Sequence, residues 1–485
     1  MATETKPRSG IEPPTAKATV TRVAPTQRTR RAKLPPGPKT PAVLNMLRYA
    51  RNPFRAMRQG LRHGDCYTTR MPGQPPIVSF TDPKAIKEIF SSDPDTMRSG
   101  EALGDFLGPI IGFNSLLVLD GERWGRERRL MQPPFHGERM HEYAASIRQI
   151  TNDVIDGWSA GASFRIHSQM QMITLEVIMR VVFGVEEGIK LNSLRRALLR
   201  FLGMLDGPAA PFLFFPMFQK DLRGLTPWGR FTRYRRAVLD ILLDEIHRQR
   251  ATGTAERTDV LAMLIEARDE EGEPMSDEEL LDEMLTLLGA GHETTATSLA
   301  WTFYHVLRRP DVVRKVRQEL ENIAGAGPVE AEHLPRLAYL EAVIDETQRI
   351  TPVATAILRR VKAPVHIGGR DIPAGVNVSA PIYTVHHRPD FWPNPSRFDP
   401  DRFFTARPKP YTFFPFGGGV RRCLGAAFAG YEMKIVLAEV FSRVDMHVAP
   451  NYKAKPVLRT AAVGPSRGVP VIVDSVAPRR EIAAT

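Results

Sequence analysis

The sequence predicts a mainly α-helical protein with small β-sheets. Helical periodicity dominates from about residue 120 to residue 350. Two shorter stretches, near residues 66–82 and 353–385, are rich in proline and β-branched residues and indicate strands joined by turns. At 485 residues, with 42% apolar and 25% charged side chains, the chain has globular proportions and can bury a large core.

The clearest helix is predicted to begin at Ser276. The Ser276 side chain can cap the helix while Glu279 reciprocates three residues later, which is a capping box. Apolar residues follow at helical spacing as far as Arg309, and Pro310 ends the pattern. A helix of about 33 residues is roughly 50 Å long and crosses an entire domain.

Residues 1–33 form a basic tail. They contain eight Lys/Arg and two Asp/Glu, so they carry half of the net charge of +12. Because the tail shows no apolar periodicity, we expect it to be disordered. A basic nucleic-acid or membrane-surface binding protein is an alternative on charge alone. No stripe of aromatic and basic residues accompanies the charge, so we expect no nucleic-acid partner.

Membrane spans and disulfides are not predicted. No window near the N-terminus offers the roughly 20 apolar residues that a spanning helix needs, so we expect no stable membrane insertion. Two cysteines, Cys66 and Cys423, are too sparse for a disulfide framework. This favours a reducing compartment, and we expect a cytoplasmic protein.

The strongest chemical signal is a glycine-rich loop that delivers Cys423 to the start of a helix. The loop reads F-G-G-G-V-R-R-C-L-G from Phe416 to Gly425. Free backbone N–H groups at the helix end, with Arg421 and Arg422, favour a thiolate, which binds borderline metals including haem iron. Three glycines would let a flat cofactor approach, and Phe416 could cover the sulfur. The alternative is a buried structural cysteine beside a tight turn.

A second signal, A-G-H-E-T-T, lies in the middle of the long helix and begins at Ala290. Glycines beside hydroxyl groups suggest a local opening of the helical hydrogen bonds, where water or O₂ could sit. Glu293 next to Thr294 is a plausible proton relay. The alternative is a hydroxyl that bonds back to the preceding turn. The zinc pattern H-E-x-x-H fails because position 296 is Ala, so His292 is expected to pack rather than bind metal.

A third signal is a pair of charges on a predicted helix at residues 337–350. Glu346 and Arg349 are three residues apart and share a face of this helix. Alone, such a pair is typical of a solvated surface. Arg402 offers a second guanidinium that could share the Glu346 carboxylate in a buried network.

A fourth signal is the pair Trp124 and Arg128. Their four-residue spacing places an indole N–H and a guanidinium on one helix face, and both groups donate hydrogen bonds to anions. The alternative is a core tryptophan beside a surface arginine.

Together, these four signals resemble the cytochrome P-450 superfamily of haem-thiolate monooxygenases, in its soluble bacterial type. The resemblance rests on F-x-x-G-x-R-x-C-x-G at Phe416 to Gly425, A-G-x-E-T at Ala290 to Thr294, and E-x-x-R at Glu346 to Arg349. It implies a triangular fold, with haem b between the long central helix and the helix of the ligand cysteine. The catalytic domain would span residues 34–475, between the tail at 1–33 and a C-terminal tail at 476–485.

The resemblance also implies roles for individual residues. Cys423 would be the axial metal ligand, and Glu293 and Thr294 would be catalytic, delivering protons during oxygen activation. The implied cofactor-binding residues are Trp124, Arg128, Ala290, Arg359, Phe416, Arg421, Cys423 and Gly425. Arg360, next to Arg359, could take its role toward a haem propionate. Glu346, Arg349 and Arg402 would be structural.

The implied reaction inserts one oxygen atom from O₂ into a C–H or C=C bond of a lipophilic substrate, such as a fatty acid, terpenoid or steroid. The expected pocket is formed by residues 103–117, 212–218, 290 and 294, 353–357 and 461–463. Electrons would come from a ferredoxin or flavodoxin type partner with its reductase, docking beside Arg126, Arg129, Arg422 and Lys434. A haem-thiolate peroxygenase or isomerase is the nearer alternative.

Overall fold

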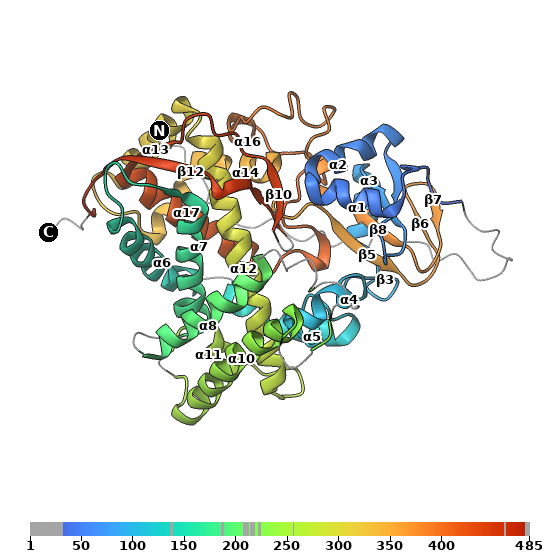
Figure 1. Cartoon of the computed structure of the whole chain (residues 1–485), viewed down its shortest axis with the longest axis horizontal. Helices are drawn as coiled ribbons and strands as arrows, with labels where there is room; N and C mark the ends of the chain where they lie inside the picture. The colour runs from blue at the N-terminus through green and yellow to red at the C-terminus, as the bar shows by residue number, and fades with distance from the viewer. Residues whose placement is uncertain are drawn as a thin grey trace, which may run out of the picture.

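A computed structural model of the protein describes residues 33–135, 139–185, 189–206, 213, 219–221, 225–255, 257–459 and 462–480. Helices make up the larger part of the molecule, and a smaller part rich in strands lies beside them (Figure 1). The expectation of a mainly helical protein with small sheets is confirmed.

The helices are listed here in chain order. They are α1 (Ala42–Arg51), α2 (Pro53–Gly60), α3 (Pro83–Phe90), α4 (Gly100–Ile111), α5 (Gly121–Met131), α6 (Arg139–Asp156), α7 (Ile166–Val177), α8 (Ile189–Asp206), α10 (Pro227–Thr252), α11 (Val260–Glu266), α12 (Asp277–Val306), α13 (Pro310–Ala324), α14 (Ala338–Ile350), α15 (Ile382–Val385), α16 (Asp401–Thr405) and α17 (Ala426–Arg443). Shorter 3-10 or π segments are η1 (Leu61–His63), η2 (Pro133–Phe135), η3 (Ile178–Val182), η5 (Ala331–Arg336), η6 (Gly419–Arg421) and η7 (Ser466–Gly468).

Strands form small separate sheets. They are β1 (Cys66–Thr69), β2 (Ile77–Phe80), β3 (Met97–Arg98), β4 (Ser163–Arg165), β5 (Ile357–Val361), β6 (Val365–Ile367), β7 (Arg370–Ile372), β8 (Asn377–Ala380), β9 (Val444–Val448), β10 (Pro456–Arg459), β11 (Ala462–Pro465) and β12 (Pro470–Val476). The largest sheet has the order β1-β2-β8-β5-β3 and is antiparallel except for the parallel pair β2 and β8. The others are β6-β7, β10-β11 and β4-β12-β9.

The strands confirm both stretches predicted from the sequence and add a third. β1, β2 and β5 to β8 fall in or beside residues 66–82 and 353–385. The short strands β3 and β4 and the strands β9 to β12 were not predicted. β12 joins two partners, β4 and β9, that are far apart in the chain, so packing rather than a local hairpin signal creates that sheet.

Helix α12 is the central element and begins as predicted. The Ser276 hydroxyl accepts from Glu279 N, and the Glu279 carboxylate accepts from Ser276 N at 2.8 Å. The predicted end at Arg309 is wrong, because α12 stops at Val306 and Pro310 is the first residue of α13. Proline is well suited to a first helical position, where its missing N–H costs nothing.

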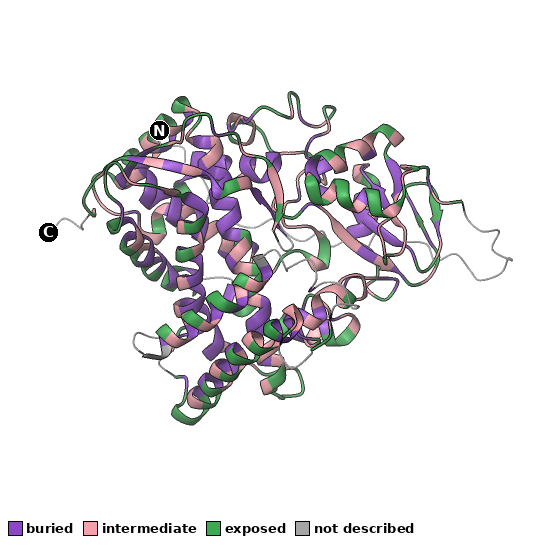
Figure 2. Ribbon diagram, in the orientation of Figure 1, coloured by how far each residue is buried: buried purple, intermediate pink, exposed green. Residues whose placement is uncertain are grey.

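The hydrophobic core surrounds α12. Its residues from Thr295 to Phe303 are all buried, and α12 packs against α7, α14, α17 and β11. Buried residues run along these helices, while the outer parts of the molecule are coloured as exposed (Figure 2). Within the described residues, no helix is both long and apolar enough to cross a lipid bilayer.

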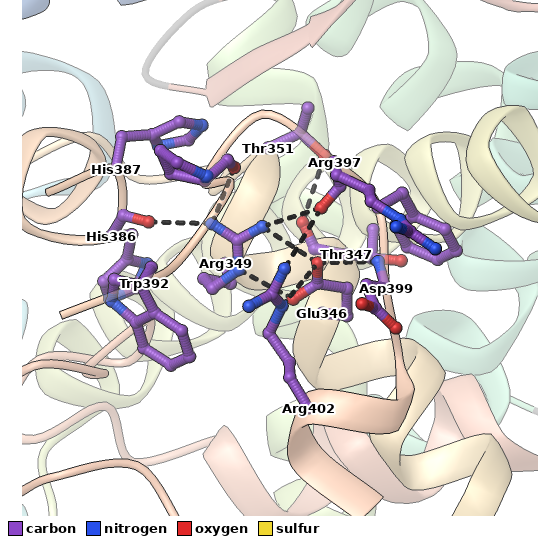
Figure 3. A network of polar contacts seen from close by, with 12 residues as sticks. Glu346, Thr347, Arg349, Thr351, His386, His387, Trp392, Arg397, Asp399 and Arg402 are labelled. Atoms are coloured by element: carbon purple, nitrogen blue, oxygen red, sulfur yellow. Dashed lines mark hydrogen bonds and ion pairs between the residues drawn. The ribbon is translucent and has the colours of Figure 1, made fainter. Parts of the chain in front are cut away.

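A buried ionic network joins α14 to the chain around α16 (Figure 3). Arg349 donates to both carboxylate oxygens of Glu346, at 2.7 and 2.8 Å, and Arg402 Nε lies 3.2 Å from the same carboxylate. Asp399 N donates to Glu346 at 2.9 Å, and Arg349 also donates to the His386 carbonyl at 2.8 Å. Glu346 and Arg349 are fully buried, so the predicted network is confirmed.

Candidate active site

The loop that carries Cys423 ends where α17 begins. Gly425 is the N-cap of α17, and Cys423 N donates to the Phe416 carbonyl at 3.0 Å, which closes the loop on itself. Cys423 is a free cysteine with an exposed side chain, although the helix that follows is largely buried. The predicted placement of a cysteine at a helix N-terminus is confirmed.

The surroundings of Cys423 act on its thiol in opposite directions. Burial raises the pKa of Cys423, whereas a hydrogen bond from the Gly425 backbone and the charges of Arg128 and Arg422 lower it, and the net shift is upward. The thiol is therefore enclosed by protein on most sides while one side stays accessible. The expectation that these surroundings favour a thiolate is therefore not met, because the net shift favours the thiol. A metal ion at the accessible side would displace the proton and bind the sulfur as the thiolate.

Two glycines of this loop are needed because Phe90, at the end of α3, packs against them. A Cβ on Gly418 would lie 2.3 Å from the Phe90 ring, and one on Gly419 would lie 2.0 Å from the Phe90 carbonyl oxygen. Gly419 also has a φ of +66°, which favours glycine. We expected the glycines to make room for a flat cofactor. The structure shows that at least two of them make room for the end of α3.

Arginine and tryptophan side chains gather beside the loop. The Arg421 guanidinium lies 4.0 Å from the centre of the Trp124 ring, and that of Arg128 lies 5.7 Å from it. Arg421 also donates to Asp120 Oδ1 at 2.5 Å, and Arg128 donates to the Arg422 carbonyl at 2.9 Å. The fourth sequence signal therefore lies next to the first.

Of the two neighbouring arginines on β5, Arg359 faces this cluster. Arg359 is buried and donates to Ser99 Oγ at 2.8 Å, whereas Arg360 donates to Asn377 Oδ1 at 2.6 Å. The pKa of Arg421 is lowered to about 10, mainly by burial and also by the charges of Arg359 and Arg128, against the opposing effect of Asp120. Burial likewise lowers the pKa of Arg359 to about 10. The cluster thus has more positive than negative charge, and a bound anion would stabilise it.

The second sequence signal presents an exposed face in the middle of α12. Gly289, Ala290 and Thr294 are exposed, although the residues that follow are buried. The Thr294 hydroxyl donates back to the Ala290 carbonyl. The helix is continuous from Asp277 to Val306, so the expected opening of its hydrogen bonds is not found. The side-chain hydroxyl adds a second donor to the Ala290 carbonyl without breaking the helix.

Glu293 points from α12 toward α7. Its carboxylate lies 3.2 Å from His167 Nε2 and accepts hydrogen bonds from Gln171 at 2.8 Å and from Thr297 at 3.2 Å. Burial acts to raise the pKa of Glu293, but the hydrogen bond and charge of His167, with smaller effects of His292 and Gln171, lower it overall. The carboxylate is therefore held in its ionised form.

His292 packs in the core, as expected. Its Nδ1 lies 2.8 Å from the Thr174 hydroxyl, and burial lowers its pKa to about 4, so the ring is neutral. The described part of the chain contains no cluster of three or more His, Cys, Asp or Glu residues that could hold a metal ion. A zinc site of the H-E-x-x-H kind is absent from α12.

Some segments of the expected pocket can be placed. Residues 112–117 are tied to the start of α12, where Asn114 N donates to Asp282 at 3.1 Å and Leu116 N donates to Glu283 at 2.6 Å. Val463 N donates to the Val353 carbonyl at 2.9 Å. Residues 212, 214–218 and 461 lie outside the described residues.

Comparison with known proteins places this site in a family. A sequence model of the cytochrome P-450 family matches residues 34–470. The chain belongs to the cytochrome P-450 family. It is 37% identical over 457 residues to a Mycobacterium tuberculosis protein named cytochrome P-450 135B1, covering 93% of each chain. It is 34% identical over 444 residues to cytochrome P-450 138 of the same organism, covering 91% of this chain and 96% of the relative.

Solved structures show the same fold. A cyanobacterial protein, CYP120A1 with bound retinoic acid, superposes with a TM-score of 0.79 at 25% identity, over 92% of this chain and all of that one. The haem domain of cytochrome P-450DA superposes with a TM-score of 0.77 at 22% identity, over 94% of this chain and all of that one. The predicted cytochrome P-450 fold is therefore confirmed.

The family assigns the cofactor and the class of enzyme. Cytochromes P-450 are haem-thiolate monooxygenases that use haem b, O₂ and a redox partner, and this chain is an oxidoreductase of that class. The residues present fit haem b. The accessible thiol of Cys423 is a suitable ligand for the haem iron. The cationic cluster of Arg128, Arg359 and Arg421 is suited to pairing with the two carboxylates of haem.

Two residues expected to dock a redox partner are engaged within the protein. Arg126 bonds to Asp269 at 2.6 Å and also contacts Glu127 and Glu279. Lys434 lies 3.1 Å from Glu341 and donates to the Leu334 carbonyl. These charges are neutralised by local acids, so Arg126 and Lys434 are poor candidates for an acidic partner.

Three residues of this P-450 site were missed from the sequence. Asp120 accepts from Arg421 and also from the backbone of Ser99, Gly100 and Glu101 at the start of α4. His167 and Gln171 bind Glu293 from α7, more than 120 residues away in the chain. No local pattern marks any of the three, because their partners come from distant segments.

Proposed function

We propose that this P-450 inserts one oxygen atom from O₂ into a C–H or C=C bond of a lipophilic substrate, with Cys423 as the axial ligand of haem. The observation that carries the proposal is the accessible thiol of Cys423 at the N-terminus of α17, within electrostatic reach of Arg128 and Arg422. Haem, when bound, supplies the chemistry that activates oxygen.

The protein side chains would hold and orient the cofactor. Trp124, Arg128, Arg359 and Arg421 would donate hydrogen bonds to the propionates. Arg359 is preferred to Arg360 for this role because the Arg360 guanidinium is engaged by Asn377. Ala290, Phe416 and Gly425 would contact the ring or surround the sulfur.

Glu293 and Thr294 would manage protons during oxygen activation. The lowered pKa of Glu293 keeps its carboxylate ionised at neutral pH, so it can take up a proton from the side of α7 and pass it on. In this structure the carboxylate faces His167 and Gln171, so delivery toward the exposed face of Thr294 requires a rotation of the Glu293 side chain.

The substrate would be a fatty acid, a terpenoid or a steroid. The retinoic acid held by the cyanobacterial neighbour is a lipophilic molecule, which supports this class. Phe113 and Leu117 of the segment tied to α12 are exposed large apolar side chains and could line such a pocket.

Electrons would come from a ferredoxin or flavodoxin type partner that docks near Cys423. Arg422 is exposed beside the cysteine, and Arg129 is an exposed residue that pairs with an exposed Glu270. Residues 34–475 would be one catalytic domain, which the family match over residues 34–470 supports. Two free cysteines, Cys66 and Cys423, fit a reducing, cytoplasmic location.

The decisive experiment is the substitution Cys423→Ser, with Cys66→Ser as the matched control. Reduced wild-type protein should give the carbon monoxide absorption band that defines the family. We expect Cys423→Ser to lose this band and Cys66→Ser, a buried change in β1, to keep it. Retention of the band by Cys423→Ser would refute the ligand assignment.

A further inference from the structure

The hairpin of β10 and β11 lies against two segments that the proposed pocket includes. Trp301 of α12 donates from Nε1 to the Val463 carbonyl at 2.9 Å. Val463 N donates to the Val353 carbonyl at 2.9 Å. The hairpin therefore lies between the central helix and the chain that follows α14.

Arg459 is on the side of this hairpin that faces α12. It pairs with Ala462 across the hairpin and folds back over Gly464. A Cβ on Gly464 would lie 3.0 Å from Arg459 Cδ, 3.2 Å from its Nε and 3.5 Å from Cγ2 of Thr297. Gly464 therefore provides the room that the Arg459 side chain occupies next to α12.

Among the described residues, no carboxylate pairs with the Arg459 guanidinium. Its Nε is buried without a hydrogen-bond partner, and no ion pair forms with Arg459 anywhere in the described ranges. Glu293 lies one helical turn before Thr297 on α12, but its carboxylate is already engaged by His167, Gln171 and Thr297. Arg98 also has a buried, unpartnered Nε, but its Nη2 lies 3.8 Å from Asp95.

A partly buried guanidinium without an acceptor is unfavourable, because desolvation of a charged donor is not offset by a hydrogen bond. A ligand that brings an acceptor would remove this cost. The planar fork of arginine matches the two oxygens of a carboxylate. Thr297 follows Thr294 by three residues on α12, so a carboxylate at Arg459 would lie about one helical turn along α12 from the proposed oxygen site, next to the side on which Glu293 and His167 lie.

We propose that Arg459 binds the carboxylate of the substrate, and that the substrate is therefore a lipophilic carboxylic acid. This inference rests on the proposed function, because it places the acid in the same pocket. The hydrocarbon part would extend past the exposed Ala290 and Thr294 toward the apolar residues Phe113 and Leu117.

The test compares an acid with its uncharged ester in the haem-loaded enzyme. Dodecanoic acid, hexadecanoic acid and their methyl esters are titrated into wild type and into Arg459→Gln, and binding is followed by the haem spin-state change. We expect Arg459→Gln to weaken binding of the acids about tenfold to a hundredfold, the range for a charged hydrogen bond, and to leave binding of the esters unchanged.

Other variants of the hairpin keep the inference testable if Arg459→Gln folds poorly. Arg459→Lys retains the charge but not the fork, and Gly464→Ala displaces the side chain, so both should weaken binding of the acids by a smaller factor. Leu458→Gln, at an exposed position on the other face of β10, should change nothing.

Three results would overturn the inference. They are equal binding of acid and ester by wild type, unchanged acid binding by Arg459→Gln, and equal weakening of acid and ester by that variant. Each leaves the proposed function intact, since the carbon monoxide band of the wild type tests that function separately.

Discussion

His167 Nε2 of α7 lies 3.2 Å from Oε1 of Glu293 in the middle of α12. Gln171, one turn further along α7, donates to the other carboxylate oxygen at 2.8 Å. The acid of the proposed relay is therefore held by a helix on the side away from the exposed face of Thr294. His167 and Gln171 are positioning residues for Glu293, and they determine where it takes up protons.

Replacement of His167 by Leu should raise the pKa of Glu293. Burial alone raises this pKa, and the hydrogen bond and charge of His167 are the largest effects that lower it. The limb of the pH profile of kcat that reports the ionisation of Glu293 should therefore move to higher pH. KM should change less than kcat, because the His167 side chain is buried between α7 and α12.

The control is His247→Gln, an exposed histidine paired with Asp277. It should leave the profile unchanged. A His167→Leu enzyme with the wild-type pH profile and normal kcat would show that His167 is only a packing residue.

Replacement of Thr294 by Ala should uncouple electron consumption from product formation. The hydroxyl faces the exposed side of α12, so its loss should leave haem binding intact while product formation falls about a hundredfold and peroxide accumulates. Thr302→Ala removes an equivalent hydroxyl that bonds back to Ser298 in the buried part of the helix, and it should keep normal coupling. Full peroxide-driven turnover by Thr294→Ala would favour a peroxygenase instead.

Replacement of Glu346 by Ala should lower the free energy of unfolding by about 3–5 kcal/mol, because Arg349 would be left buried without its counter-ion. The measurement is thermal unfolding, with the yield of haem-loaded protein as a second readout. Glu341→Ala, on the same helix, removes a half-exposed partner of Lys434 and should cost less than about 1 kcal/mol. Equal losses in the two variants would contradict the special role of the buried network.

Replacement of Glu432 by Gln should stabilise the protein at alkaline pH. Burial raises the pKa of Glu432 from 4.5 to about 8, so the folded state retains a proton that the unfolded state releases. The free energy of unfolding of the wild type should therefore fall as the pH rises through this window, by up to about 5 kcal/mol.

Glu432→Gln lacks this titration, so its advantage over wild type should grow between pH 4.5 and about 8 and then level off. Unfolding temperatures measured across this range test the difference. Tyr431→Phe, at the adjacent position, does not titrate there and should follow the wild type. Parallel curves for Glu432→Gln and wild type would show that the carboxyl is not buried in the folded protein.

The elements that could be predicted from the sequence are those whose partners are close in the chain. Ser276 and Glu279 are three residues apart, and their capping box forms as predicted. The loop that ends at Cys423 closes on Phe416, seven residues away. The end of α12 was predicted less well, because a proline such as Pro310 can end one helix or begin the next. In the structure the chain turns at Leu307, so α12 ends at Val306 and Pro310 begins α13.

What the sequence by itself determined is the family, the class of fold and the identity of the chemical groups. These depend on contiguous motifs whose geometry follows from helical and loop spacing. The tertiary structure alone decided which groups meet. It placed Phe90 under the glycines of the cysteine loop, Asp120 against Arg421, and His167 against Glu293. Each of these pairs joins segments far apart in the chain, and such contacts arise from the packing of whole helices and sheets, which local residue patterns do not specify.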